Sequence, residues 1–194
     1  MITIIAALSE HDGKYVIGKD GDLPWPMKKA RRLDMKRFAE LTAGKEGEPG
    51  HPVIMGRKTW ESLEGDYQPL PGRMNYVLTR NEKYSVAQPG AFTCRTLDEA
   101  LLAADMKTPF MKNIDYDHVY IIGGSSIYQE CLERANRMEL TFMHTSYDGD
   151  AFFPKLDFAQ IDADKDDTWK LVKEVTPEFK NPAKGLTFRT YEKK

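Results

Sequence analysis

Four short runs of apolar residues constrain the fold of this 194-residue chain more than any other feature. Each run has the length of a strand and is almost continuously apolar, as in a strand that is covered on both faces. The runs occupy residues 1–8, 52–55, 75–79 and 118–122. Because helical patterns alternate with them, they predict an α/β domain with a mainly parallel central sheet.

The helical patterns are predicted at residues 27–42, 57–63, from Thr96 onward, and at 125–134. Thr96 and Glu99 form a capping box, which marks a helix start. Residues 138–145 predict a further strand, and residues 169–176 and 186–192 alternate polar and apolar side chains, which favours an antiparallel edge. No repeat or linker interrupts the chain, so we expect one domain over residues 1–194.

Charge and composition exclude several classes of function. The 28 basic and 30 acidic residues give a net charge of −2, which gives no reason to expect a nucleic acid or an anionic membrane as partner. No apolar run approaches the ~20 residues of a membrane span, and the first residues lack the basic lead of a signal peptide, so we expect a cytoplasmic protein. The two cysteines and four histidines have no metal-ligand spacing, so no metal site is expected.

Asp34 interrupts the apolar face of the predicted helix 27–42. At 100° per residue, that face carries Met27, Ala30, Leu33, Met35, Phe38 and Leu41, and Asp34 lies near its middle. A carboxylate in apolar surroundings must find a donor, hold a proton or wait for a ligand. It is either a structural group that caps an amide or pairs with Arg31 or Arg37, or an acid that binds a polar heterocycle.

Two glycine breaks, at Gly56 and at Gly123-Gly124, end apolar runs and precede helices. Ligands of parallel sheets bind at these carboxyl ends, where free backbone amides suit a phosphate. Arg57, Lys58 and Arg80 form either a solvated basic edge or a phosphate cradle. The GxGxxG fingerprint, the Walker motif and any nucleophile with a base are absent from the sequence.

Three further residues have a structural and a functional interpretation. Arg73 follows a turn, and it either forms a structural ion pair or captures a ligand carboxylate. Trp25, between two prolines, is a core side chain or part of a site. Thr141 is either an ordinary strand residue or a site residue.

Seven blocks of sequence, taken together, resemble dihydrofolate reductase. They are MITIIAAL, VIG with DLPW, DMKRFAELT, PVIMGRKTWESL, PLPGRMNYVLTR, VYIIGGSSIY and ELTFMHTSYDGDAFFP, and LTFRTYEK resembles the family's C-terminal strand. The resemblance implies that family's single-domain fold, with helices on both faces of a mainly parallel sheet and an antiparallel C-terminal strand. It also implies NADPH-dependent reduction of 7,8-dihydrofolate to 5,6,7,8-tetrahydrofolate by a cytoplasmic monomer of one-carbon metabolism.

The resemblance assigns roles residue by residue. Asp34 matches the acid that binds the pteridine, Thr141 its hydrogen-bonding threonine, and Trp25 the tryptophan that orders water nearby. Arg73 resembles the arginine that pairs with the glutamate tail. The apolar residues that line the family's substrate site have these counterparts here: Ile5, Ala7, Met35, Phe38, Leu63 and Leu70.

The implied cofactor site is larger, and residues 19–23 resemble the mobile loop that closes over the nicotinamide. The implied NADPH contacts are Ala7, Ile17, Gly18, Leu23, Gly56, Arg57, Lys58, Thr59, Leu78, Thr79, Arg80, Ile122, Gly123, Gly124, Ser125, Ser126, Ile127 and Tyr128. In the implied reaction, C6 of dihydrofolate gains a hydride and N5 gains a proton, for which we expect delivery by water rather than directly by Asp34.

Three segments differ in length from the family's pattern. The interval from Trp25 to Asp34 is about one helical turn longer, residues 64–68 add length, and residues 107–117 look inserted. Asp34 stays the predicted acid because the helix face and its four-residue spacing to Phe38 select it independently. Two rival functions are another reductase on this fold, such as the pyrimidine reductase of riboflavin synthesis, and a nucleotide-binding module without catalysis.

Overall fold

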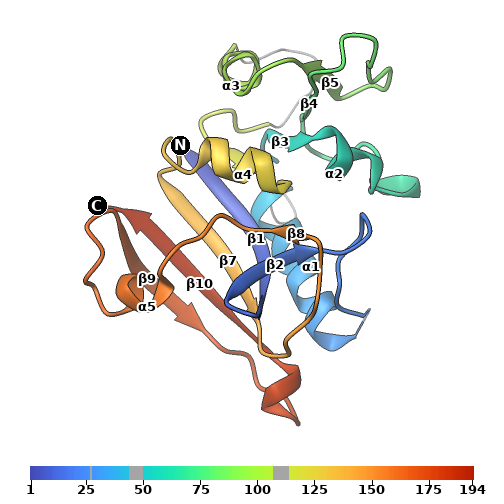
Figure 1. Cartoon of the computed structure of the whole chain (residues 1–194). Helices are drawn as coiled ribbons and strands as arrows, with labels where there is room; N and C mark the ends of the chain where they lie inside the picture. The colour runs from blue at the N-terminus through green and yellow to red at the C-terminus, as the bar shows by residue number, and fades with distance from the viewer. Residues whose placement is uncertain (27, 44–49, 107–113) are drawn as a thin grey trace.

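The computed structural model describes residues 1–26, 28–43, 50–106 and 114–194. Among these residues a ten-stranded sheet forms the centre of the fold (Figure 1). The strands are β1 (Ile2–His11), β2 (Lys14–Gly18), β3 (Val53–Gly56), β4 (Asn75–Leu78), β5 (Ala91–Cys94), β6 (Val119–Ile121), β7 (Arg137–Met143), β8 (Ala151–Phe152), β9 (Trp169–Val175) and β10 (Leu186–Lys193). The spatial order is β5-β4-β3-β6-β1-β7-β10-β9, with β2 paired to β1 and β8 paired to β2.

The strand directions confirm the predicted sheet. The strands from β5 through β4, β3, β6 and β1 to β7 are each parallel to their neighbours. β10 is antiparallel to both β7 and β9, so it is the antiparallel C-terminal strand that the alternating pattern predicts. The buried runs of the sequence lie in the parallel part, where both faces of each strand are covered.

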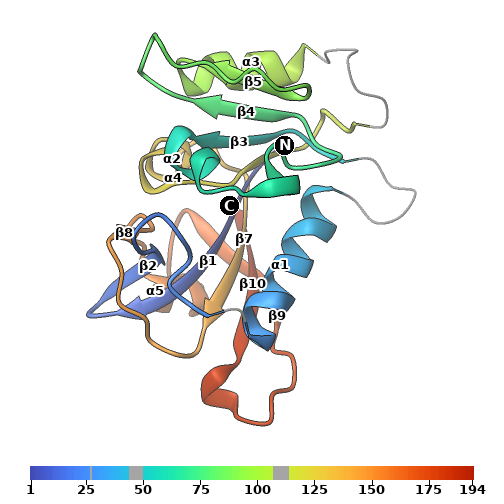
Figure 2. The same ribbon diagram turned by 90° about the vertical axis from the view of Figure 1, so that its right-hand side faces the viewer.

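Helices cover both faces of the sheet, as the resemblance implies. α1 (Lys29–Thr42) and α2 (Arg57–Glu61) pack on one face, and Figure 2 shows α1 running beside β7. On the other face lie α3 (Leu97–Asp105), α4 (Ser125–Cys131) and α5 (Phe158–Asp162). The alternation of β1 separates the two cores: Ile4 and Leu8 pack with α3, α4 and α5, whereas Ile5 packs with Phe38 of α1 and Trp60 of α2.

Most predicted helices appear with shifted ends. α1 begins at Lys29, and Met27 lies outside the described residues. Thr96 caps α3 by accepting a hydrogen bond from the backbone N–H of Glu99, as predicted. The predicted insertion at 107–117 falls mostly outside the described residues; within the part that is described, Ile114 forms a β-bridge with Gly50.

Three short strands and one short α-helix were not predicted from the sequence: β2, β5, β8 and α5. β2 forms a hairpin with β1 through Asp12 and Gly13, whose φ angles are 49° and 70°. An Asp-Gly pair with positive φ is a strong hairpin signal, so β2 was readable from the sequence. β5, β8 and α5 have no such signal, because each is short and depends on contacts with distant segments.

No helix among the described residues has both the length and the hydropathy that crossing a membrane requires. The same part of the chain contains no group of three or more His, Cys, Asp or Glu side chains arranged to hold a metal ion. Cys94 and Cys131 are both buried and free, and burial raises the pKa of each thiol.

Candidate active site

The carboxylate of Asp34 lies between α1 and β7. It accepts a hydrogen bond from the Thr141 side chain, and burial raises its pKa to about 6. The hydrogen bond to Thr141 and the charges of Arg37 and Arg31 lower the pKa and only partly offset this desolvation. Asp34 is therefore a weakened acid in a low-dielectric setting, which is a feature of functional carboxyl groups.

The floor beneath Asp34 is formed by one face of three neighbouring strands. Ala7 of β1 and Phe188 of β10 flank Thr141 on β7. From the opposite face of the sheet, the hydroxyl of Tyr128 donates a 2.8 Å hydrogen bond to the carbonyl of Ile5. Burial and the charge of Asp34 raise the pKa of Tyr128, so this phenol is neutral. The predicted residues Ile5, Ala7, Thr141 and Tyr128 are thus brought around Asp34.

The two arginines that the sequence offered as partners of Asp34 are bound to other groups. Arg31 donates to the carboxylate of Asp22 at 3.1 Å and to the carbonyl of Trp25 at 3.3 Å. Arg37 forms a close ion pair with the carboxylate of Glu139 on β7. Since neither guanidinium is hydrogen-bonded to Asp34, the interpretation of Asp34 as half of a structural ion pair is wrong.

Trp25 is buried in a cluster with Met143 and Leu186, and its ring lies 6.1 Å from that of Tyr147. Within the described residues its indole Nε1 has no hydrogen-bond partner. A buried donor without a partner costs free energy, so this N–H points to a ligand or water that binds there.

The predicted apolar walls are mostly assembled together. Phe38 and Leu63 are half-buried and pack with buried Leu70 in the cluster that includes Ile5. Met35 differs, since it is 39% exposed on α1. Met35 is therefore not part of this core cluster.

Arg73 is buried, with 4% of its surface exposed. Its guanidinium donates to Thr42 Oγ1 at 2.8 Å and to the carbonyl of Pro71 at 3.0 Å, and it lies 5.6 Å from the ring centre of Phe38. No carboxylate among the described residues pairs with it, so the structural ion pair considered for Arg73 is not found. Burial lowers its pKa to about 10, which leaves a buried cation at neutral pH.

The two glycine breaks meet at the carboxyl ends of β3 and β6. The N–H of Gly56 donates to the carbonyl of Gly123 at 2.7 Å. Gly123 has a φ of 106°, and a Cβ there would lie 3.0 Å from the ring of Tyr128. At Gly124 a Cβ would lie 3.4 Å from Thr59 Oγ1. Gly123 therefore needs glycine, whereas a Cβ at Gly124 would make an ordinary contact with Thr59.

Other predicted cofactor residues surround this junction. β8 connects two of them, since Ala151 pairs with Gly18 of β2 and the N–H of Phe152 donates to Ser125 Oγ at 3.1 Å. Arg57 forms a 3.1 Å ion pair with Glu61, whereas Lys58 and Arg80 are exposed. The buried or half-buried members of the set are Ile17, Leu23, Leu78, Thr79, Ile122 and Ile127, and Ser126 is exposed.

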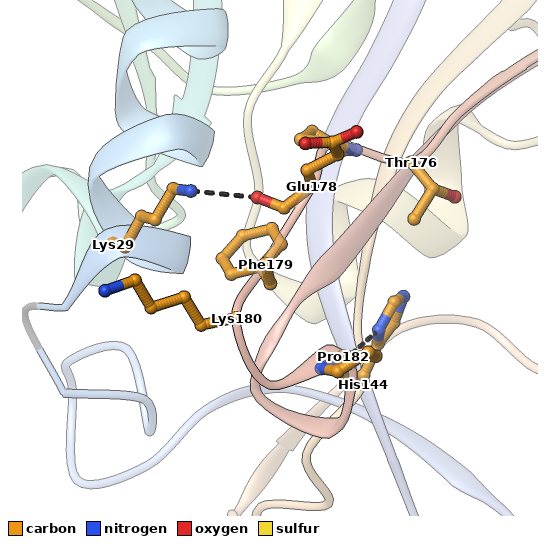
Figure 3. A pocket seen from close by; sticks show the side chains of 8 residues that line it. Lys29, His144, Thr176, Glu178, Phe179, Lys180 and Pro182 are labelled. Carbon is orange, nitrogen blue, oxygen red and sulfur yellow. Dashed lines mark hydrogen bonds between the residues drawn. The ribbon is translucent and has the colours of Figure 1, made fainter.

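A separate groove of about 640 Å³ lies between the start of α1 and the segment that joins β9 to β10 (Figure 3). In it the ammonium of Lys29 donates to the carbonyl of Glu178 at 2.8 Å and lies over the ring of Phe179. None of the predicted site residues lines this groove, so it is distinct from the region around Asp34.

The sequence matches one protein family over nearly its whole length. The family model described as Dihydrofolate reductase matches residues 1–193. Dihydrofolate reductase of Sus scrofa is 35% identical over 200 residues, which cover 99% of this chain and 97% of that protein. This chain belongs to the dihydrofolate reductase family.

Further relatives agree with this family. The bifunctional dihydrofolate reductase-thymidylate synthase of Glycine max is 40% identical over 149 residues, and the match covers 73% of this chain but 26% of that protein. The chain thus spans about a quarter of the length of such bifunctional relatives. A solved dihydrofolate reductase from Enterococcus faecalis, complexed with NADP(H) and RAB-propyl, superposes with a TM-score of 0.71 at 28% identity, covering 100% of this chain and 96% of that one.

These matches thus show the family of this chain, and the solved relative from Enterococcus faecalis is one that was complexed with NADP(H).

Glu139 is the residue near the reductase site that the sequence reasoning missed. It lies two residues before Thr141 in β7, with its side chain 4% exposed. A signal was present, since a carboxylate interrupts the apolar and hydroxyl side chains of residues 138–143, as Asp34 interrupts its helix. Its partner Arg37 is 102 residues away in the sequence, so the pairing itself was not visible.

Proposed function

We propose that this chain reduces 7,8-dihydrofolate to 5,6,7,8-tetrahydrofolate with NADPH, and that Asp34 is the group that binds the pteridine. The observation that carries the proposal is the carboxyl group of Asp34, half-buried between α1 and β7, hydrogen-bonded to Thr141 and with a pKa of about 6. A carboxylate in this setting favours a ligand that offers two N–H donors side by side, as the amino group and ring nitrogen of a pterin do.

The raised pKa suits a reaction that consumes a proton. Near neutral pH the site formed by Asp34 and the pterin holds or releases one proton at little cost, which is what a general acid needs. We assign delivery of the proton to N5 to a water molecule, held near the indole N–H of Trp25. The unpaired Nε1 of that buried side chain supports this assignment, because a bridging water would satisfy it.

Arg73 is proposed to bind the carboxylate of the substrate's glutamate tail. Its burial, its hydrogen bonds to Thr42 and to the Pro71 carbonyl, and its contact with Phe38 hold the guanidinium in place before a substrate arrives. A buried cation that has no carboxylate partner in the described chain strongly favours an anionic ligand. The apolar walls of Phe38, Leu63 and Leu70 would contact the ring that joins pterin and tail.

The junction of β3 and β6 fits a dinucleotide cofactor. A Cβ at Gly123 or Gly124 would fill the space beside Tyr128 and Thr59, and the glycines leave room for close approach of a phosphate. When bound, NADPH supplies the hydride for C6 of dihydrofolate. We assign Thr59, Arg57, Lys58 and Arg80 to its phosphates, since cationic and hydroxyl side chains follow β3 and β4.

The remaining assignments are also proposals. A single domain over residues 1–194, a monomer and a place in the cytoplasm are consistent with one continuous sheet and balanced charge. The net charge of −2 also supports a small-molecule enzyme rather than a partner of nucleic acid or membrane.

The test is the loss of nicotinamide absorbance when the purified chain meets NADPH and dihydrofolate. We expect oxidation by the wild type and a loss of at least a hundredfold in kcat/KM for Asp34→Asn. Asp98→Asn serves as the control, because Asp98 is exposed in a pair with Arg134 on the far face. Full activity of Asp34→Asn would contradict the assignment of Asp34. Binding of NADPH without oxidation by the wild type would favour either a reductase with another substrate or a nucleotide-binding module without catalysis.

A further inference from the structure

Glu139 is a buried carboxylate next to the active site for which the reaction described above has no use. Three groups bind it: Arg37 of α1, Arg137 Nε at 2.7 Å and Thr190 Oγ1 at 2.8 Å. Its side chain is 4% exposed, so the charge is removed from water and depends on these donors.

The register of α1 and β7 relates Glu139 to Asp34. Glu139 and Thr141 are two residues apart in β7, and side chains at this spacing lie on the same face of a sheet. Asp34 and Arg37 are three residues apart in α1, so they lie on neighbouring turns of one helix face. The structure joins them in pairs, Asp34 to Thr141 and Arg37 to Glu139. Two adjacent links therefore fix α1 against β7.

Arg37 is also a charge that acts on Asp34. It lowers the pKa of Asp34, as does Arg31 one turn before the acid. Two other groups hold the guanidinium of Arg37 away from Asp34. One is the carboxylate of Glu139, and the other is the ring of Phe188, whose centre lies 4.7 Å from Arg37 Cζ.

Of the other charged groups near Asp34, Arg31 has one buried donor, Nε, without a partner in the described residues. Arg31 is bound to the carboxylate of Asp22, which is 71% exposed, and to the carbonyl of Trp25. Tyr128, which approaches from α4, is neutral because burial raises its pKa. Glu139 is therefore the one buried carboxylate that neutralises an arginine beside Asp34 in the described residues.

We propose that Glu139 is a positioning residue for the reductase, which holds Arg37 on β7 and keeps an unpaired guanidinium away from the carboxylate of Asp34. The proposal rests on the assigned role of Asp34 in binding the pterin. Without Glu139, the free charge of Arg37 stabilises the Asp34 carboxylate and reduces the fraction of enzyme that carries a proton at neutral pH. Without Arg37, the bare carboxylate of Glu139 has the opposite effect.

The test is a double-mutant cycle with Glu139→Gln and Arg37→Gln. The titration of Asp34 is followed by ¹³C NMR in ligand-free protein that carries ¹³C at the aspartate carboxyl groups, and Asp34→Asn identifies the signal. We expect the titration midpoint to fall by about one pH unit in Glu139→Gln and to rise by about one unit in Arg37→Gln, the order of shift that a nearby charge produces. The double variant should return to within about half a unit of the wild type.

The pH profile of kcat/KM should move with the NMR midpoint in each variant. Glu192→Gln is the matched control, because Glu192 binds Arg137 but not Arg37 and should leave both readouts unchanged. If Glu139→Gln does not fold, Arg37→Gln must still titrate about one unit above the double variant. A midpoint that is equal in the folded variants would overturn the proposal and leave Glu139 a structural residue only.

Failure of this inference is separable from failure of the proposed function. An active Asp34→Asn enzyme would refute the role of Asp34, whatever the titrations show. An inactive Asp34→Asn enzyme with unmoved midpoints in the other variants would refute only the role of Glu139.

Discussion

A hydrogen bond joins Asp34 of α1 to Thr141 of β7, which lies 107 residues later in the sequence. The bond thereby connects the helix to the central sheet. The bond stabilises the carboxylate form of Asp34, whereas burial opposes it and prevails, so the pKa stands near 6. The same bond fixes where the acid lies relative to Ala7 and Ile5, which form the floor of the site.

Thr141→Val tests this hydrogen bond. Valine keeps the shape of threonine but offers no donor, so the carboxylate of Asp34 loses a bond worth about 1.5–3 kcal/mol. We expect the pKa of Asp34 to rise further, which moves the inflection of the pH profile to higher pH. Loss of the bond that positions the acid should lower the limiting kcat/KM at low pH by roughly ten- to a hundredfold. Steady-state kinetics measures this, with Thr93→Val on β5 as a control for the same substitution outside the site. An unchanged kcat/KM would mean that Thr141 has no part in the site.

Asp34→Asn should stabilise the fold while it abolishes activity. The folded pKa of about 6 lies above the ordinary value of 3.8, so the folded state binds this proton more tightly than the unfolded chain does. The wild type therefore loses stability as pH rises from below 4 to above 6, by about 3 kcal/mol for a shift of roughly two units. Asparagine does not ionise, and this loss is absent in the variant.

Urea unfolding at pH 4 and pH 7.5 measures the difference. The variant and the wild type should be nearly equal at the lower pH, and the variant should be the more stable at the higher. Asp98→Asn is the control, and its effect on stability at pH 7.5 should have the opposite sign. The reason is that Arg134 holds the pKa of Asp98 below its ordinary value. Equal stability of Asp34→Asn and wild type at pH 7.5 would contradict the raised pKa.

Arg73→Met tests the proposed tail site. Removing one partner of a buried charge pair costs about 2–5 kcal/mol, so KM for dihydrofolate should rise by roughly thirtyfold or more. A dihydropterin substrate that lacks the glutamate tail should be reduced equally well by the variant and the wild type. Equal increases of KM for both substrates would show that Arg73 acts on the fold rather than on the tail.

Gly123→Ala tests the cofactor junction. The φ of 106° is unfavourable for alanine, and the new Cβ would meet the Tyr128 ring at 3.0 Å. We expect the dissociation constant for NADPH, measured by fluorescence titration, to increase by roughly five- to a hundredfold, for a local strain of about 1–3 kcal/mol. Gly65→Ala is the control, because Gly65 also has a positive φ but open space around it. Wild-type affinity in Gly123→Ala would remove this glycine from the cofactor site.

The sequence predicts the sheet well because burial leaves a local signature. Continuous apolar runs predicted the parallel strands β1, β3, β4 and β6, and the alternation in 186–192 predicted β10. Asp34 was also readable, since a single carboxylate interrupts an apolar helix face. The carboxylate partners of Arg31 and Arg37 could not be predicted from the sequence. Arg31 meets Asp22 only when α1 packs against the loop after β2, and Arg37 meets Glu139 only when α1 packs against β7. Such pairings depend on register between distant segments, which no local pattern encodes.

The pH dependence of kcat/KM for dihydrofolate, in the wild type and in Asp34→Asn, tests the central claim most directly. Because the reaction takes up a proton, we expect wild-type kcat/KM to be constant below about pH 6 and to fall as Asp34 ionises above it, since this profile reports the free enzyme. The inflection should disappear in Asp34→Asn, together with most of the activity. A wild-type profile without an inflection near pH 6, or the same inflection in Asp34→Asn, would contradict the assignment of Asp34 as the acid that binds the pteridine.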